Sequence, residues 1–247
     1  MCEDSGMSAM KVATPMVRPF TSTTGRRSIS AAAAILIAAI LFIAPCGLST
    51  PAGLPSAAAA PCPDVQIVFA RGTSETPGIG RVGQALVDTL QPKLGGRSLG
   101  TYAVNYPASY DFLAAADGAA DATAHIAAMA QQCPSTRIVL GGYSQGAAVV
   151  AMLAGIPPLG NKVGEVGSAP PLPHSVADNV AAVAVFGNPS TKFGNPVSAS
   201  PLFAGRAIDL CSDGDPICSD GRNPFAHTNY PSSGYPTQAA NFVAGLV

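Results

Sequence analysis

The chain has 247 residues, a length that suits one or two domains, and 48% of them are hydrophobic. Only 11% are charged, against about 25% in an average globular protein. The net charge is −1, which argues against a nucleic-acid partner and leaves an apolar globular domain as the simplest reading.

The first 60 residues have the pattern of an export signal. Four basic residues come early: Lys11, Arg18, Arg26 and Arg27. The apolar run Ala31–Ala44 follows, and it is shorter than the roughly 20 residues that a membrane-spanning helix needs. We expect cleavage near Ala59 or Ala60, with a retained membrane anchor as the alternative. Residues 61–247 would then form a single domain, secreted or associated with the cell wall.

Short β-branched runs alternate with helical stretches after residue 60. The expected strands are Val65–Ala70, Thr101–Asn105, Arg137–Leu140, Val180–Phe186 and Arg206–Leu210. The expected helices are Arg81–Leu90, Asp111–Gln132 and Gln145–Ala154, with Asn241–Leu246 as part of a last helix. Several strands are apolar throughout, which is typical of parallel strands buried on both faces. This order predicts one doubly wound α/β domain, with functional residues at the carboxyl ends of its strands.

A serine between glycines follows the third expected strand. The segment GGYSQG occupies residues 141–146 and leads into an expected helix. The Gly-x-Ser-x-Gly spacing is typical of a nucleophile elbow, where the chain turns so sharply that side chains at the flanking positions would clash. We therefore predict Ser144 as a nucleophile. An ordinary serine in a glycine-rich turn is the alternative.

His227 is the expected base among three histidines. In folds with this elbow, the acid and then the base follow the nucleophile along the chain. His125 precedes Ser144 and lies on an expected helix. His174 has only Glu165 between itself and the serine as a possible acid. His227 lies in an expected loop near the C-terminus, after a cluster of acidic residues.

The acid is expected after the last strand. Asp178 precedes a strand, at the wrong end of the sheet, and Asp209 lies within one. Asp213, Asp215 and Asp220 are the remaining candidates, of which Asp213 and Asp215 lie after the last strand and inside the expected Cys211–Cys218 loop. We prefer Asp215 because Pro216 stiffens the turn after it, while a solvated turn is the alternative for both acids.

Four cysteines remain after residue 60, and an even number in an exported chain favours two disulfides. Cys211 and Cys218 flank a turn that contains the expected acid, so they form the expected local pair. This leaves Cys62 to pair with Cys133. Metal binding is the alternative, but the chain has no Cys-x-x-Cys pair with a nearby histidine, so we expect no metal site.

Acyl transfer needs hydrogen-bond donors where negative charge develops. The backbone N–H of Gln145, directly after the nucleophile, is the first expected donor. The second is expected after the first strand, where Gly72 permits close approach and Thr73 offers an N–H and a hydroxyl. Capping of the following helix by Thr73 or Ser74 is the alternative, and the spacing alone does not separate the two.

With these residues in place, the chain resembles the cutinase family, in its actinobacterial branch. The likeness runs from about Cys62 to the C-terminus, and it is carried by the segments FARGTSE, GGYSQGA, VFGNPS and CSDGDPIC, followed by His227. The resemblance implies an α/β-hydrolase fold with a central five-stranded parallel sheet, no large lid, and no metal or cofactor. It supports both disulfide pairs and the three catalytic residues. It also favours Thr73 as an oxyanion donor, at a position where cutinases have a serine.

The implied function is ester hydrolysis through an acyl-enzyme. Short- or medium-chain esters, or lipid esters near the cell envelope, are the expected substrates, with peripheral contact to the envelope or a lipid surface. A monomer is the expected state. The stretch Ser219–Phe225 departs from the family because it is more polar than the apolar flap of cutinases, which argues against greasy polymers. The alternatives are a cell-envelope acyltransferase with the same triad and a non-catalytic secreted surface protein.

Overall fold

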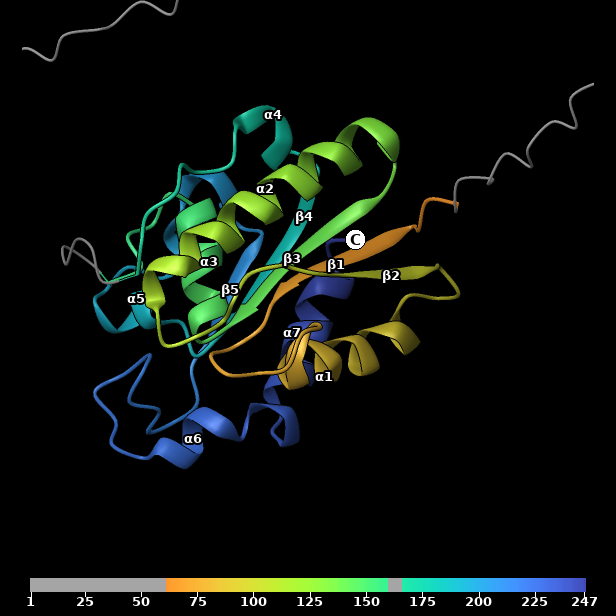
Figure 1. The fold of residues 1–247 in the computed structure, drawn as a ribbon. Helices are drawn as coiled ribbons and strands as arrows, with labels where there is room; N and C mark the ends of the chain where they lie inside the picture. The colour runs from red at the N-terminus through yellow and green to blue at the C-terminus, as the bar shows by residue number, and fades with distance from the viewer. Residues whose placement is uncertain (1–60, 160–165) are drawn as a thin grey trace, which may run out of the picture. The chain divides into compact units, whose positions relative to one another are not determined.

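The computed structural model describes residues 61–159 and 166–247, so the predicted leader at residues 1–60 lies outside the described residues. Five strands form one sheet in the order β2-β1-β3-β4-β5, and all four strand pairs are parallel (Figure 1). The strands are β1 (Val65–Ala70), β2 (Leu99–Ala103), β3 (Arg137–Tyr143), β4 (Val180–Phe186) and β5 (Ala207–Leu210). This architecture confirms the predicted α/β class with a five-stranded parallel sheet.

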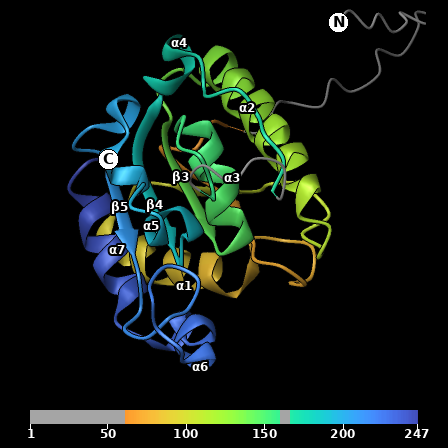
Figure 2. The same ribbon diagram turned by 90° about the vertical axis from the view of Figure 1, so that its left-hand side faces the viewer.

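Helices cover both faces of the sheet (Figures 1 and 2). On one face lie α2 (Ala115–Gln132) and α3 (Gln145–Leu153), and on the other lie α1 (Gly80–Leu90) and α7 (Tyr235–Ala244). The shorter helices are α4 (His174–Ala177), α5 (Pro189–Lys192) and α6 (Pro224–Thr228). Single 3-10 turns occur at Gln91–Lys93, Phe112–Ala114, Val197–Ala199, Pro201–Phe203 and Tyr230–Ser232. No helix in the described ranges is long and apolar enough to cross a bilayer.

The small residues of the sequence explain how closely these layers pack. Strands β1 and β4 are buried along their whole length, and so is every residue of α3. A Cβ added to Gly118 of α2 would lie 3.0 Å from the ring of Tyr106 and 3.1 Å from Val149 of α3. Helix α2 can therefore approach α3 because it carries glycine and alanine on the contact face.

Two strands differ from the sequence expectation. Strand β2 begins at Leu99 rather than Thr101, because Leu99 pairs with Val65 at the start of β1. The side chains of β2 are at least partly exposed, as suits an edge strand, so no buried apolar run marked its limits. Strand β3 extends through the two glycines to Tyr143, directly before the predicted nucleophile.

Two helices near the C-terminus also differ from the expectation in part. The segment Asn241–Leu246 was expected as part of a last helix, and it lies in α7 as far as Ala244, where the helix ends. The helix begins at Tyr235, with Pro236 in its first turn, where proline is tolerated because that N–H has no helical partner. The prediction of a loop at His227 is wrong, because His227 lies in α6. The Asn223 side chain caps this helix by accepting the Phe225 N–H at 3.1 Å.

The strand order determines where loops converge. Strands β1 and β3 lie side by side, and the chain winds outward from them in opposite directions. In such sheets, the crevice for a ligand lies outside the carboxyl ends of the strands at this switch point. The segments after β1 and β3 meet there, and those after β4 and β5 extend the same edge.

Candidate active site

Ser144 stands at the sharp turn between β3 and α3. Its backbone lies in a sparsely allowed region, at φ 55° and ψ −115°, and its N–H donates to the Phe186 carbonyl of β4 at 2.9 Å. A Cβ on Gly142 would overlap the backbone of Gly146, and a Cβ on Gly146 would overlap the Ala70 carbonyl. Both flanking glycines are therefore required, as the elbow pattern predicts.

The imidazole of His227 joins the serine to a carboxylate. Its Nε2 lies 2.8 Å from Ser144 Oγ, and its Nδ1 lies 2.8 Å from Asp215 Oδ2. The three side chains come from the end of β3, from the loop after β5 and from α6. Residues separated by 83 positions along the chain thus form one continuous line of hydrogen bonds.

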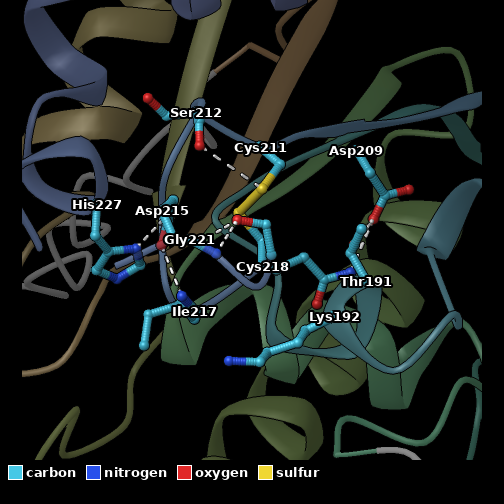
Figure 3. The surroundings of a disulfide bond; sticks show 12 residues. Thr191, Lys192, Asp209, Cys211, Ser212, Asp215, Ile217, Cys218, Gly221 and His227 are labelled. Atoms are coloured by element: carbon cyan, nitrogen blue, oxygen red, sulfur yellow. Dashed lines mark hydrogen bonds and ion pairs between the residues drawn. A yellow bond between two sulfur atoms is a disulfide. The ribbon is translucent and has the colours of Figure 1, made fainter. Parts of the chain in front are cut away.

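Asp215 is completely buried, yet its carboxylate has three donors. Besides His227, the Ile217 N–H donates to Oδ1 at 2.8 Å and the Tyr230 hydroxyl donates to Oδ2 at 2.7 Å. Figure 3 shows the hydrogen bonds from His227 and Ile217. Burial raises the pKa of Asp215, but the hydrogen bonds from His227, Ile217 and Tyr230 lower it further, so the net pKa is below its usual value. The group is therefore a carboxylate, suited to stabilising an imidazolium.

Both expected disulfides are present. Cys211 and Cys218 are joined at 2.05 Å and close the loop that carries Asp215 (Figure 3). Cys62 and Cys133 are joined at 1.98 Å and link the start of the domain to the end of α2.

The rejected candidates have other roles or lie elsewhere. Asp209 accepts four hydrogen bonds in a cluster that ties β5 to the loop after β4. Asp213 lines an adjacent pocket of 340 Å³. His125 stacks on Tyr102 with ring centroids 3.5 Å apart, and its Nε2 lies 2.8 Å from Gln66 Oε1.

Thr73 and Gln145 meet beside the serine. The Thr73 hydroxyl donates to the Gln145 side-chain oxygen at 3.2 Å, and both residues line the same pocket as Ser144. Gln145 is the first residue of α3, where the backbone N–H has no partner within the helix. The Gly72 N–H is already taken by the Glu75 carboxylate at 2.7 Å, so the next backbone donor in this loop is that of Thr73.

The capping alternative for Thr73 or Ser74 is wrong. Glu75 is the residue that supports the start of α1, because its Oε1 accepts the Arg81 N–H at 3.0 Å. Glu75 thus braces the loop after β1 through one carboxylate oxygen and holds the helix through the other.

Sequence reasoning assigned no role to three residues around the imidazole. The Tyr143 hydroxyl donates to the His227 carbonyl at 2.6 Å, and the two rings stack with centroids 5.1 Å apart. Burial, with the charges of Glu75 and Asp215, raises the pKa of Tyr143 to about 12, so its phenol remains a donor. Gly187, at φ 58°, lies where a Cβ would come within 2.9 Å of the imidazole.

The third is Tyr230, described above. Tyr143 and Gly187 lie inside segments that the sequence singled out, GGYSQG and VFGNPS, and could have been found there. Nothing in the sequence around Tyr230 signals a partner at Asp215.

A pocket of 520 Å³ opens at the serine. Part of its wall is apolar, formed by Phe112, Ala148, Leu159, Val166 and Ile217. Polar side chains, including Thr73, Glu75, Arg81 and Thr228, line the remainder. This volume falls within the range typical of small-ligand sites. In residues 61–159 and 166–247, no three His, Cys, Asp or Glu side chains are grouped so that they could hold a metal ion.

Known proteins are similar to this chain in sequence and in fold. The family model named Cutinase matches residues 61–247. Phospholipase Culp4 of Mycobacterium tuberculosis is 53% identical over 191 residues, covering 77% of this chain and 81% of that protein. Probable carboxylesterase Culp3 of the same species is 53% identical over 192 residues, covering 76% of this chain and 71% of that protein. The structure of Trichoderma reesei cutinase with a phosphonate inhibitor gives a TM-score of 0.58 at 33% identity, covering 75% of this chain and 77% of that one. The chain therefore belongs to the cutinase family of carboxylic ester hydrolases.

Proposed function

We propose that the chain hydrolyses carboxylic esters by nucleophilic catalysis at Ser144. The observation that carries this proposal is the line of two 2.8 Å hydrogen bonds from Ser144 through His227 to Asp215. Ser144 and His227 line a pocket together with the expected oxyanion donors Thr73 and Gln145.

The first half-reaction makes an acyl-enzyme. His227 Nε2 accepts the hydroxyl proton while Ser144 Oγ attacks the ester carbonyl carbon, and Asp215 stabilises the imidazolium. The carbonyl oxygen becomes an oxyanion that the N–H groups of Gln145 and Thr73, with the Thr73 hydroxyl, stabilise. The carbon–oxygen bond to the alcohol then breaks, and the imidazolium returns its proton to the leaving alcohol.

Water completes the cycle at the same site. His227 takes a proton from water, whose oxygen attacks the acyl carbon and forms a second oxyanion. The bond to Ser144 Oγ breaks, the serine regains its proton from the imidazolium, and the carboxylic acid leaves.

The pocket supports short- or medium-chain acyl groups, or the acyl chains of lipids, as substrates. Its apolar wall can receive a hydrocarbon chain, while the polar side near Arg81 and Thr228 can receive the alcohol portion. One relative is named a phospholipase and another a probable carboxylesterase, so both kinds of ester are candidates for this chain.

An apolar rim around the pocket supports contact with a lipid surface or the cell envelope. Tyr110, Phe112 and Ile217 line the pocket and are exposed, with Tyr110 78% exposed. Leu113 and Phe225 are exposed as well, so the polar stretch before His227 still carries one large apolar side chain. Exposed apolar patches of this kind mark interaction surfaces.

We also propose that residues 1–60 are an export leader removed near Ala59 or Ala60, and that residues 61–247 are the secreted or cell-wall domain. Two disulfides support this placement, since they persist in oxidising compartments. N-terminal sequencing of the exported protein should begin near residue 60 or 61, and a retained first segment would contradict the proposal.

The test is a Ser144→Ala variant, assayed on p-nitrophenyl esters from acetate to palmitate, with phospholipid and polyester beside them. We expect loss of at least about 1,000-fold in kcat, because the nucleophile is gone. Ser198→Ala, an exposed serine outside the pocket lining, should match the unaltered protein. A fluorophosphonate probe should label all proteins except Ser144→Ala, and equal labelling of that variant would contradict the proposal.

The same assay separates hydrolysis from acyl transfer. With an added alcohol or sugar acceptor, we expect free acid as the main product. A dominant new ester would favour the acyltransferase alternative instead.

A further inference from the structure

The hydrogen-bonded residues Ser144, His227 and Asp215 form what we call the catalytic line. We propose that Tyr230 is its fourth member, a positioning residue that fixes the Asp215 carboxylate and draws negative charge from the oxygen that faces His227. The inference rests on the proposed function, because it assigns a role within the same catalytic line. It starts from a phenol that lies at 0% exposure beside a buried carboxylate.

The hydrogen bonds of the phenol leave one direction for its proton. The Ser212 N–H points at the Tyr230 oxygen from 2.9 Å, so the oxygen accepts there. Asp215 Oδ2 lies 2.7 Å away, and a carboxylate can only accept. Cys218 Sγ lies 3.5 Å from the same oxygen, but a disulfide sulfur is a far weaker acceptor than a carboxylate, so the single phenolic hydrogen lies on the line to Asp215.

Oδ2 of Asp215 consequently receives two donors at once. The imidazole Nδ1 approaches it to 2.8 Å, and the phenol approaches it to 2.7 Å. The other oxygen, Oδ1, receives the Ile217 N–H at 2.8 Å (Figure 3). Rotation of the carboxylate would break bonds at both oxygens, so its plane stays directed at His227.

The ring of Tyr230 is itself held in place. It meets the ring of His227 edge-on, at 90° and 6.3 Å between centroids, and it lies 5.7 Å from Tyr143 and 6.0 Å from Phe186. These contacts come from α6, β3 and β4, so the hydroxyl is carried by a side chain that three separate elements orient. A phenol placed this firmly is pre-organised to act as a donor.

Ser212 lies in the disulfide-closed loop, while Tyr230 lies outside it in the turn Tyr230–Ser232. The phenol thus ties this loop to the segment that carries His227. The acid and the base are held together through it as well as through their own hydrogen bond.

The phenolic hydrogen lowers the negative charge on Oδ2, and this determines the direction in which the pH profile should move. A carboxylate stabilises the protonated imidazole, and a phenol that draws charge from Oδ2 weakens that effect. Without the phenolic hydrogen, Oδ2 would carry more negative charge and stabilise the imidazolium more strongly, so the acidic limb of kcat/KM would move upward. Two further titratable side chains pack against this pair: Tyr143 contacts both rings and lies in the field of Asp215, and Tyr235 contacts Tyr230. Asp213 lies in the same disulfide-closed loop, and the charges of Glu75 and Arg81 act on Tyr143.

The first experiment compares Tyr230→Phe with Tyr235→Phe. The Tyr235 hydroxyl donates to the Cys211 carbonyl at 3.1 Å, close to the same loop but outside the catalytic line. For Tyr230→Phe we expect kcat to fall about tenfold with KM unchanged, and the acidic limb to move up by about 0.5 pH unit. For Tyr235→Phe we expect an unchanged pH profile, although its stability falls.

A second variant tests the opposite sign with almost no change in shape. 3-Fluorotyrosine at position 230, introduced by suppression of a stop codon, has a more acidic phenol and is a stronger donor. We expect its acidic limb to move below that of the unaltered protein, with kcat retained. This variant also answers the question if Tyr230→Phe fails to fold.

The outcomes separate the two proposals. Activity in Ser144→Ala would overturn the proposed function itself. If Ser144→Ala is inactive but the acidic limb stays fixed in both Tyr230 variants, the function stands and the role of Tyr230 is overturned. Opposite shifts in the two variants support the role.

Discussion

At the residue scale, the hydroxyl of Thr73 has two possible acceptors. In the resting structure it donates to the Gln145 side-chain oxygen at 3.2 Å. When an oxyanion forms beside Ser144, the negatively charged acceptor should compete with the neutral amide, because charged acceptors form stronger hydrogen bonds. Thr73→Val removes the hydroxyl and keeps the shape. We expect kcat on p-nitrophenyl butyrate to fall about 100-fold with little change in KM, measured by steady-state kinetics.

The matched control is Thr73→Ser, which keeps the hydroxyl and loses a methyl group. It should stay within about fivefold of the unaltered protein, since only one methyl group changes. Equal activity in Thr73→Val and Thr73→Ser would mean that the hydroxyl is not used in catalysis.

Single residues could be predicted where the chemistry forces a local pattern. Ser144 could be predicted because a strained turn demands glycines on both sides. His227 could be predicted because the chain has few histidines and the base must follow the nucleophile and the acid. Tyr230 could not be assigned, because its role depends on where the turn Tyr230–Ser232 lies in space. No local spacing records such a contact.

At the element scale, the two disulfides act on different properties. Cys211–Cys218 encloses Asp215 within a separation of seven residues, whereas Cys62–Cys133 spans 71 residues. Chain entropy assigns about 2.5 kcal/mol to the short loop and about 4 kcal/mol to the long one. We expect Cys211→Ser/Cys218→Ser to lower kcat at least about tenfold, since the carboxylate loses its frame. Cys62→Ser/Cys133→Ser should lower stability more and leave kcat within about twofold.

Each double variant serves as the control for the other. Urea unfolding followed by circular dichroism gives the stability, and ester hydrolysis at a temperature where both proteins remain folded gives kcat. If the two variants lose activity equally at equal fractions folded, the short disulfide has no special connection to the acid.

Elements with a strong pattern were predicted well, and elements defined by their neighbours were not. Strands β1 and β4 match the expected bounds because their side chains are buried along the whole length. Strand β2 was displaced because an edge strand takes its register from β1. The segment Asn241–Leu246 was expected as part of a last helix, and α7 contains it as far as Ala244; the start of α7 at Tyr235 was not predicted.

At the scale of the whole molecule, alternation of strands and helices predicted the sheet but not the order of its strands. The order β2-β1-β3-β4-β5 follows from which loops cross over which face, and helices on both faces satisfy the apolar strands equally well in other orders. The position of the site was still predictable, because every parallel order gathers the carboxyl ends of the strands on one side.

Global stability should depend on pH through the same carboxylate that serves the site. Folding lowers the pKa of Asp215, so the folded protein binds that proton less tightly than the unfolded chain. The stabilisation is therefore fully present above the pKa of Asp215 in the unfolded chain, about 3.9. It is lost as the pH falls through the lower pKa of the folded protein. Asp64 is the other carboxylate among the described residues with a lowered pKa, held down first by the hydroxyl of Ser98.

Asp215→Asn is therefore expected to flatten the acid dependence of stability. The urea midpoint of the unaltered protein should fall steeply below about pH 4. The midpoint of the variant should be lower at neutral pH, and the two midpoints should become equal in acid. Asp64→Asn should keep most of the slope, because that side chain is exposed and solvent screens its interactions. A full slope in Asp215→Asn, or its loss in Asp64→Asn, would mean that the buried carboxylate does not couple the catalytic line to folding.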